Sequence, residues 1–120
     1  MKYTQLLPFM DEQELMDVAT EIISGNIKNI RIEKLYPFLK SEDLNNLVDK
    51  LIEAKEVSSL HSVLPFISKE KVFVIYRAAE QGQLEGFDQS SCLPFLDSSM
   101  VKEIFRDLIK KANDETDDES

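Results

Sequence analysis

The sequence predicts an all-α protein: four tandem helix-pair repeats of about 28–29 residues, stacked in a short right- or left-handed α-solenoid. Three observations predict this fold: a recurring Pro-Phe pair, an apolar helical pattern after each pair, and capping residues at matching places. The pairs are Pro8-Phe9, Pro37-Phe38, Pro65-Phe66 and Pro94-Phe95. They are spaced 29, 28 and 29 residues apart and use all four prolines of the chain, so chance is a poor explanation.

A long amphipathic helix is expected after each pair. Counting from each proline, the residues at +7, +10, +11 and +14 are all apolar or aromatic. This spacing places them on one face of an α-helix. The residues are Leu15, Val18, Ala19 and Ile22; Leu44, Leu47, Val48 and Leu51; Val72, Ile75, Tyr76 and Ala79; and Val101, Ile104, Phe105 and Leu108.

Start and stop signals frame the same four helices. Residues that favour an N-cap stand three or four positions after each proline. They are Asp11, Ser41, Ser68 and Asp97. Gly25 and Gly82 stand at matching helix ends, where glycine favours a C-cap. Unit two has Ala54 there, so we expect its exit to be less sharply defined.

A shorter apolar segment precedes each proline and is expected to form a short helix. These segments cover residues 3–7, 32–36, 60–64 and, more weakly, 87–93. Proline turns the chain because it lacks an N–H and disfavours helix in the residue before it. The following phenylalanine should then be a buried corner, so Phe38→Ala or Phe66→Ala should cost roughly 3–5 kcal/mol.

The predicted units cover residues 1–25, 26–54, 55–82 and 83–112, within one domain of residues 1–112. One helix pair cannot bury its apolar face alone, whereas stacked pairs share a continuous core. A β-structure is disfavoured because the apolar residues do not alternate. The one segment of strand-like composition, residues 72–76, keeps the helical spacing.

Charge and hydropathy limit the partners and the location. The chain has 120 residues and a formal net charge of −9, and an acidic chain repels nucleic-acid phosphates. Residues 113–120 carry five acids and no large apolar side chain, so we expect a disordered acidic tail. No apolar run has the length of a signal peptide or a membrane span, and cysteine occurs once. A cytoplasmic location without membrane contact is expected.

Residues 1–112 resemble the helical-repeat class that includes HEAT, armadillo and tetratricopeptide proteins. The unit is shorter than the roughly 34 residues of a tetratricopeptide repeat, and the chain has no tryptophan. The Leu-Pro-Phe corners are similar to repeats of uncharacterised bacterial proteins. Helical-repeat families mostly act as binding scaffolds, so the resemblance implies a protein–protein interaction module.

Side chains with catalytic or metal-binding chemistry are few. His61 and Cys92 are the only histidine and cysteine, and they stand 31 residues apart. Cys92 occupies an apolar position before a proline and is expected to be a small buried hydrophobe. His61 is expected at the surface or between helices. Acidic residues gather in first helical turns, where they favour the helix dipole. We therefore expect no catalytic residue, no metal site and no cofactor.

Unit three departs from the pattern of the other units. At +8 and +9 it carries Phe73 and Val74, where the other units are polar apart from Met16. Either unit three is central and packs on two sides, or these three residues form a surface for a partner or for self-association, with Arg77 at its rim. The sequence thus predicts a non-enzymatic protein–protein interaction module with an unknown protein partner. A homo-oligomerising structural protein, such as a homodimer, is the alternative, and an enzyme is the remote one.

Overall fold

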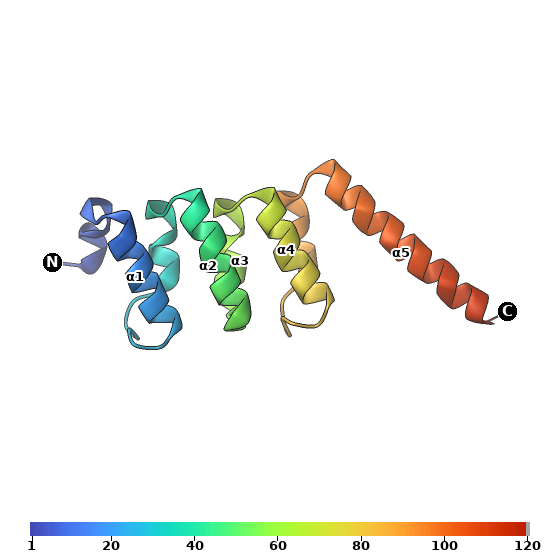
Figure 1. Ribbon diagram of the computed structural model, residues 1–120, viewed down its shortest axis with the longest axis horizontal. Helices are drawn as coiled ribbons and strands as arrows, with labels where there is room; N and C mark the ends of the chain where they lie inside the picture. Colours follow the sequence, from blue (N-terminus) through green and yellow to red (C-terminus); the bar gives the residue numbers. More distant parts are fainter. Residues whose placement is uncertain (120) are drawn as a thin grey trace.

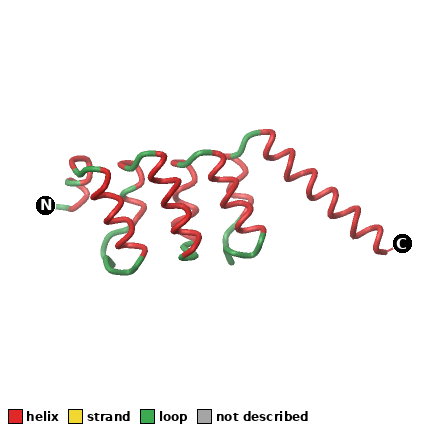
Figure 2. Tube along the Cα trace, viewed as in Figure 1, coloured by secondary structure: helices red, strands yellow, loops and turns green. Residues whose placement is uncertain are grey.

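The computed structural model describes the backbone of residues 1–119 and the side chains of residues 1–114. Every regular element within residues 1–119 is helical, which confirms the predicted all-α class (Figure 2). Three long helices, α1 (Glu12–Ile23), α2 (Ser41–Glu53) and α4 (Lys69–Glu80), lie side by side in chain order (Figure 1). A fourth, α5 (Ser98–Glu119), points away from this row. The molecule is elongated, with principal extents of 68 × 27 × 19 Å.

Short helices precede the long ones and contain the Pro-Phe pairs. They are η1 (Tyr3–Gln5), η2 (Leu7–Phe9), η3 (Ile32–Lys34), η4 (Tyr36–Phe38), α3 (Val57–Val63), η5 (Leu64–Phe66) and η6 (Gln89–Phe95). Each Pro-Phe pair lies in a 3-10 helix. In η2, η4 and η5 the proline stands near the start, where its missing N–H is not needed, whereas Pro94 lies inside η6. The residue after each pair is extended, so the chain changes direction there.

Side chains cap three of the four long helices three residues after the proline. The cap acceptors and their backbone N–H donors are Asp11 Oδ1 with Glu14 at 2.8 Å, Ser68 Oγ with Lys71 at 3.2 Å, and Asp97 Oδ1 with Met100 at 2.9 Å. Each bond satisfies one of the N–H groups that a helix start leaves without an intrahelical partner.

Helix α2 begins differently from the prediction. Its N-cap is Lys40, and Ser41, the expected cap, is the first helical residue. Lys40 occupies the +3 position that carries the cap in the other units. A lysine side chain cannot accept an N–H bond; instead its Nζ lies 2.6 Å from Oε2 of Glu12 in α1. A cap within one helix is thus replaced by an ion pair between neighbouring helices.

The helices α1, α2 and α4 end in the same left-handed turn. The left-handed residues are Gly25 at φ +86°, Lys55 at φ +57° and Gly82 at φ +82°. In each turn the next N–H bonds to a carbonyl five residues earlier in the chain: Asn26 to Glu21, Glu56 to Leu51 and Gln83 to Ala78, at 2.9–3.0 Å. This pattern is the Schellman motif. The exit of unit two is therefore as well defined as the others, although its left-handed residue is a lysine.

The core follows the spacing read from the sequence. In α1, α2 and α4 every residue at +7, +10, +11 and +14 is buried or half-buried. Each of these helices also packs on the short helix that follows it: α1 on η3, α2 on α3 and α4 on η6. The short helices contribute fully buried residues two positions before the proline, namely Leu35, Val63 and Cys92.

The predicted burial of the corner phenylalanines is wrong. Phe38, Phe66 and Phe95 are 37–39% exposed, and Phe9 is 87% exposed. In units one to three the residue just before the proline is buried, and the ring after the proline lies over the edge of the core. Phe66, for example, lies with its ring centroid 5.9 Å from that of Tyr36.

Helix α5 extends beyond the predicted domain end. Its backbone stays helical through residues 113–119, where the sequence predicts a disordered tail; Ser120 lies outside the described residues. Once a helix is nucleated, each added residue contributes one hydrogen bond, so a polar segment can prolong it. No helix within residues 1–119 combines the length and apolarity needed to cross a bilayer.

Candidate functional site

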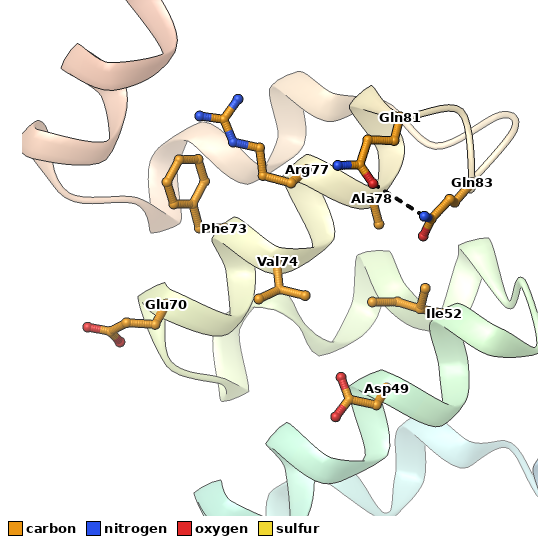
Figure 3. A pocket seen from close by; sticks show the side chains of 9 residues that line it. All are labelled: Asp49, Ile52, Glu70, Phe73, Val74, Arg77, Ala78, Gln81 and Gln83. Atoms are coloured by element: carbon orange, nitrogen blue, oxygen red, sulfur yellow. Dashed lines mark hydrogen bonds between the residues drawn. The ribbon is translucent and has the colours of Figure 1, made fainter.

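A surface groove of about 430 Å³ lies between α2 and α4 (Figure 3). It is lined by Asp49, Ile52, Glu70, Phe73, Val74, Arg77, Ala78, Gln81 and Gln83. The groove thus contains Phe73 and Val74, two of the three residues singled out in the sequence. Met16, the third, lies on α1 and is not among the lining residues.

Val74 supplies the exposed apolar surface of the groove. Val74 is 44% exposed, and Figure 3 shows it between the two helices with Ile52 across from it. It stands at +9 of its helix, outside the set of positions that faces the core. An apolar side chain at an otherwise polar position leaves surface that a partner's side chain can cover.

Phe73 is less available than Val74 because Arg77 covers it. The guanidinium carbon of Arg77 lies 4.8 Å from the centroid of the Phe73 ring, within cation–π range. The Phe73 ring also lies 6.1 Å from that of Tyr76. Phe73 is therefore half-buried on its own helix and forms a wall of the groove.

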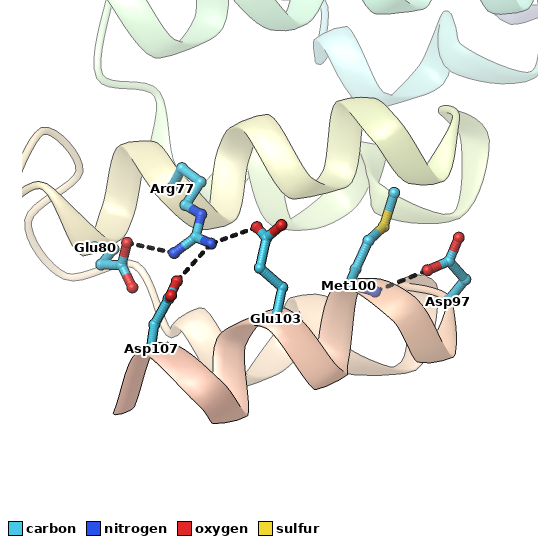
Figure 4. Close-up of polar contacts among 6 residues, drawn as sticks. All are labelled: Arg77, Glu80, Asp97, Met100, Glu103 and Asp107. Atoms are coloured by element: carbon cyan, nitrogen blue, oxygen red, sulfur yellow. Dashed lines mark hydrogen bonds and ion pairs between the residues drawn. The ribbon is translucent and has the colours of Figure 1, made fainter. Parts of the chain in front are cut away.

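Arg77 joins α4 to α5 and is more than the polar rim expected from the sequence. Its guanidinium nitrogens donate to Glu80 at 2.9 Å, to Glu103 at 2.7 Å and to Asp107 at 2.9 Å (Figure 4). Burial alone would lower the pKa of Arg77, but these hydrogen bonds outweigh it and raise the pKa. Two of the carboxylates come from α5. The sequence pattern within unit three alone therefore could not predict this contact, which depends on how units three and four lie against each other.

The surroundings of the groove are acidic. Asp49 pairs with Lys71 at 2.7 Å, and Arg77 is shared among three carboxylates. Glu70 has no ion-pair or hydrogen-bond partner for its side chain within the described residues. Carboxylates therefore outnumber cations around Val74, and the field there favours a basic partner.

His61 and Cys92 both lie at the junction of α3 and η6 without forming a reactive site. Nδ1 of His61 is hydrogen-bonded to Oγ of Ser91 at 3.2 Å, and its ring stacks on Phe87 at 4.2 Å. Cys92 is fully buried, and this burial raises the pKa of its thiol to about 11. Both residues pack unit three against unit four. The residues that the structure describes hold no cluster of three or more His, Cys, Asp or Glu suited to a metal ion.

The chain matches no protein-family model, no curated protein and no solved structure, so no relative supplies a function for the groove.

Proposed function

We propose that this protein is a non-enzymatic protein-interaction module: a short solenoid of four helix pairs whose α2–α4 groove binds a segment of another protein. The observation that carries the proposal is Val74, an apolar residue that is 44% exposed inside an acidic groove. Concave apolar sites with a charged rim are the usual form of a recognition surface.

Four features support the four-unit array. The long helices start at the same distance from each proline, and α1, α2 and α4 end in the same turn and pack on the following short helix. Ion pairs join successive long helices. These pairs are Glu12–Lys40, Asp49–Lys71 and Lys69–Asp97. Nearest-neighbour packing of this kind is the basis of solenoid stability.

The expected occupant is a short basic segment that inserts one apolar side chain. The apolar side chain would cover Val74 and Ile52, and fully burying such a group contributes about 1.5–3 kcal/mol. The basic residues would lie near Glu70, whose carboxylate has no partner within the described residues. The net charge of −9 would further speed the approach of a basic segment.

Fluorescence anisotropy with two labelled peptides tests this proposal. One peptide is amphipathic and built of lysine and leucine, and the other has glutamate in place of lysine. We expect the wild type to bind only the lysine peptide. Val74→Asn should weaken binding about tenfold, which corresponds to about 1.4 kcal/mol. Glu70→Lys should also weaken it, because the substitution reverses the charge at the rim.

Matched controls separate the groove from general attraction by an acidic protein. Glu42 stands at the same +5 position of α2 as Glu70 does of α4, and it lies outside the groove. Leu93 is exposed to a similar degree as Val74, on η6. Glu42→Lys and Leu93→Asn should leave the dissociation constant within about twofold. Equal binding by the wild type and Val74→Asn would contradict the proposal.

A further inference from the structure

The two ends of the helix row expose residues whose counterparts inside it are buried. At the first end, Leu6 stands two positions before the proline and is 50% exposed. Its counterparts in the other units, Leu35, Val63 and Cys92, are fully buried because the preceding long helix packs on their segment. Phe9 is likewise far more exposed than the other corner phenylalanines.

The opposite end shows the complementary face. Phe105 and Leu108, at +11 and +14 of α5, are 55% and 56% exposed. Their counterparts in α2, Val48 and Leu51, are fully buried in the helix that packs on α3. We call Phe105 and Leu108 the α5 face, and Leu6 and Phe9 the Leu6–Phe9 face. Inside the chain, surfaces equivalent to these two pack against each other between successive units.

Charged residues at the two ends are also complementary, and they repeat a contact that forms between units three and four. Arg77 stands at +12 of unit three and bonds to Glu103 and Asp107, at +9 and +13 of unit four. Arg106 stands at +12 of unit four. The residues at +9 and +13 of unit one are Asp17 and Glu21.

These three groups are available for an external contact. Within the described residues, Arg106 and Glu21 have no side-chain hydrogen bond or ion pair, and all three residues are exposed. Asp17 accepts one hydrogen bond, from Gln13 at 3.0 Å, which leaves its carboxylate capacity for a further donor. The α5 end thus carries a cation equivalent to Arg77, at +12. The opposite end carries two carboxylates equivalent to Glu103 and Asp107, at +9 and +13.

We propose that copies of this chain stack end to end, with α5 of one copy covering the Leu6–Phe9 end of the next. In this contact Arg106 of one copy bonds to Asp17 and Glu21 of the next, as Arg77 bonds to Glu103 and Asp107 within the chain. The proposal rests on the four-unit array proposed above, whose internal junction it continues. Because the two faces differ, each addition leaves a free face at either end, so stacking is open-ended.

Light scattering across a concentration series, in about 0.15 M salt, tests the stacking with charge reversals. The mass of the wild type should rise with concentration past that of a dimer. Arg106→Glu should return the mass to that of a monomer, and so should Asp17→Arg/Glu21→Arg. Mixing these two variants should restore growth, because each then meets an end of opposite charge. Arg31→Glu, an exposed change on another surface, should leave the wild-type mass unchanged.

Several results would overturn the proposal. A wild type that stays monomeric at every concentration would do so, and so would one that stops at a dimer. Assemblies that Arg106→Glu leaves intact would show that a surface other than the α5 end joins the copies. Circular dichroism checks that each variant keeps the wild-type helix content. Val74→Asn should stack normally and Arg106→Glu should still bind the lysine peptide, so failure of the stacking and failure of the groove are distinguishable.

Discussion

The hydroxyl of Tyr36 donates a 3.0 Å hydrogen bond to the backbone carbonyl of Ser59, 23 residues further along the chain. Both residues are buried, so the bond joins η4 to α3 inside the core. The other units have leucine immediately before the proline, and only unit two has tyrosine. A polar group can occupy this apolar position because its hydrogen bond is satisfied.

Replacing Tyr36 by phenylalanine should lower the free energy of unfolding by about 1–2 kcal/mol. The ring would remain, but the buried carbonyl of Ser59 would lose its donor. Urea denaturation measures the change. Tyr3, whose hydroxyl makes no hydrogen bond within the described residues, provides the control, and Tyr3→Phe should leave the stability unchanged within about 0.5 kcal/mol. Equal effects of the two variants would mean that the bond adds nothing.

Alkaline pH should destabilise the fold through the same residue. Burial, with a contribution from Glu33, raises the pKa of Tyr36 above its ordinary value of 10.0. The unfolded chain therefore releases the phenolic proton first, and stability falls as the pH rises above about 10, by up to about 1.4 kcal/mol per pH unit. Urea midpoints measured between pH 8 and 11 would show the fall. Burial raises the pKa of Tyr76 as well, so Tyr36→Phe should reduce the slope without abolishing it.

The sequence predicted the parts of the fold that depend on local patterns. Helix positions, and the buried faces of α1, α2 and α4, follow from apolar spacing, and capping follows from residue type at Asp11, Ser68 and Asp97. Contacts between units could not be predicted in this way. The Lys40 side chain cannot accept a hydrogen bond from a helix N–H. Its presence at the cap position is explained by its ion pair with Glu12, which lies 28 residues away. The partners of Arg77 likewise depend on how α5 lies against α4.

Burial at the corners also depends on packing that the pattern does not specify. All four phenylalanines recur with the same spacing as core residues, so the sequence predicted the same role for them. In units two to four the residue two positions before the proline is the buried one instead, as at Leu35. For the groove, the sequence identified Phe73 and Val74 as departures from the pattern. Ile52 joined them only once α2 and α4 were placed side by side, whereas Glu70 lies one turn before Val74 on the same helix.

The exposure of the corner rings lowers the expected cost of removing one of them. Leu35→Ala should cost about 2–5 kcal/mol, because Leu35 is fully buried and its loss leaves a cavity. Phe38→Ala should cost only about 1–2 kcal/mol, because the ring already contacts water and its space can refill with solvent. Chemical denaturation of both variants gives the order directly. A larger loss for Phe38→Ala than for Leu35→Ala would restore the original idea of a buried corner.

Cys92 should report the opening of the junction between α4 and η6. Its thiol is fully buried, and burial raises its pKa from 9.0 to about 11, so the reactive thiolate is about 100-fold rarer at neutral pH than in an exposed cysteine. A thiol reagent should therefore label the native protein at least about 100-fold more slowly than the urea-unfolded chain. The absorbance of the released reagent measures both rates. Rapid labelling without denaturant would show that η6 separates from α4 in the native state.

Lys55 offers a substitution that should stabilise the fold. It holds φ at +57°, a left-handed conformation that costs a non-glycine residue roughly 1–2 kcal/mol. The equivalent residues after α1 and α4 are glycines. Lys55→Gly relieves this strain, but it also raises the conformational entropy of the unfolded chain, which lowers stability by about 0.4–1 kcal/mol. The net gain in the free energy of unfolding should be up to about 1 kcal/mol in urea denaturation.

Lys55→Ala keeps the Cβ and removes the charged end, so it should bring no gain. Gly25→Ala makes the reverse change in open space and should destabilise the protein by a similar amount. A loss of stability in Lys55→Gly would mean that the lysine side chain, and not its backbone, sets the energy of this turn.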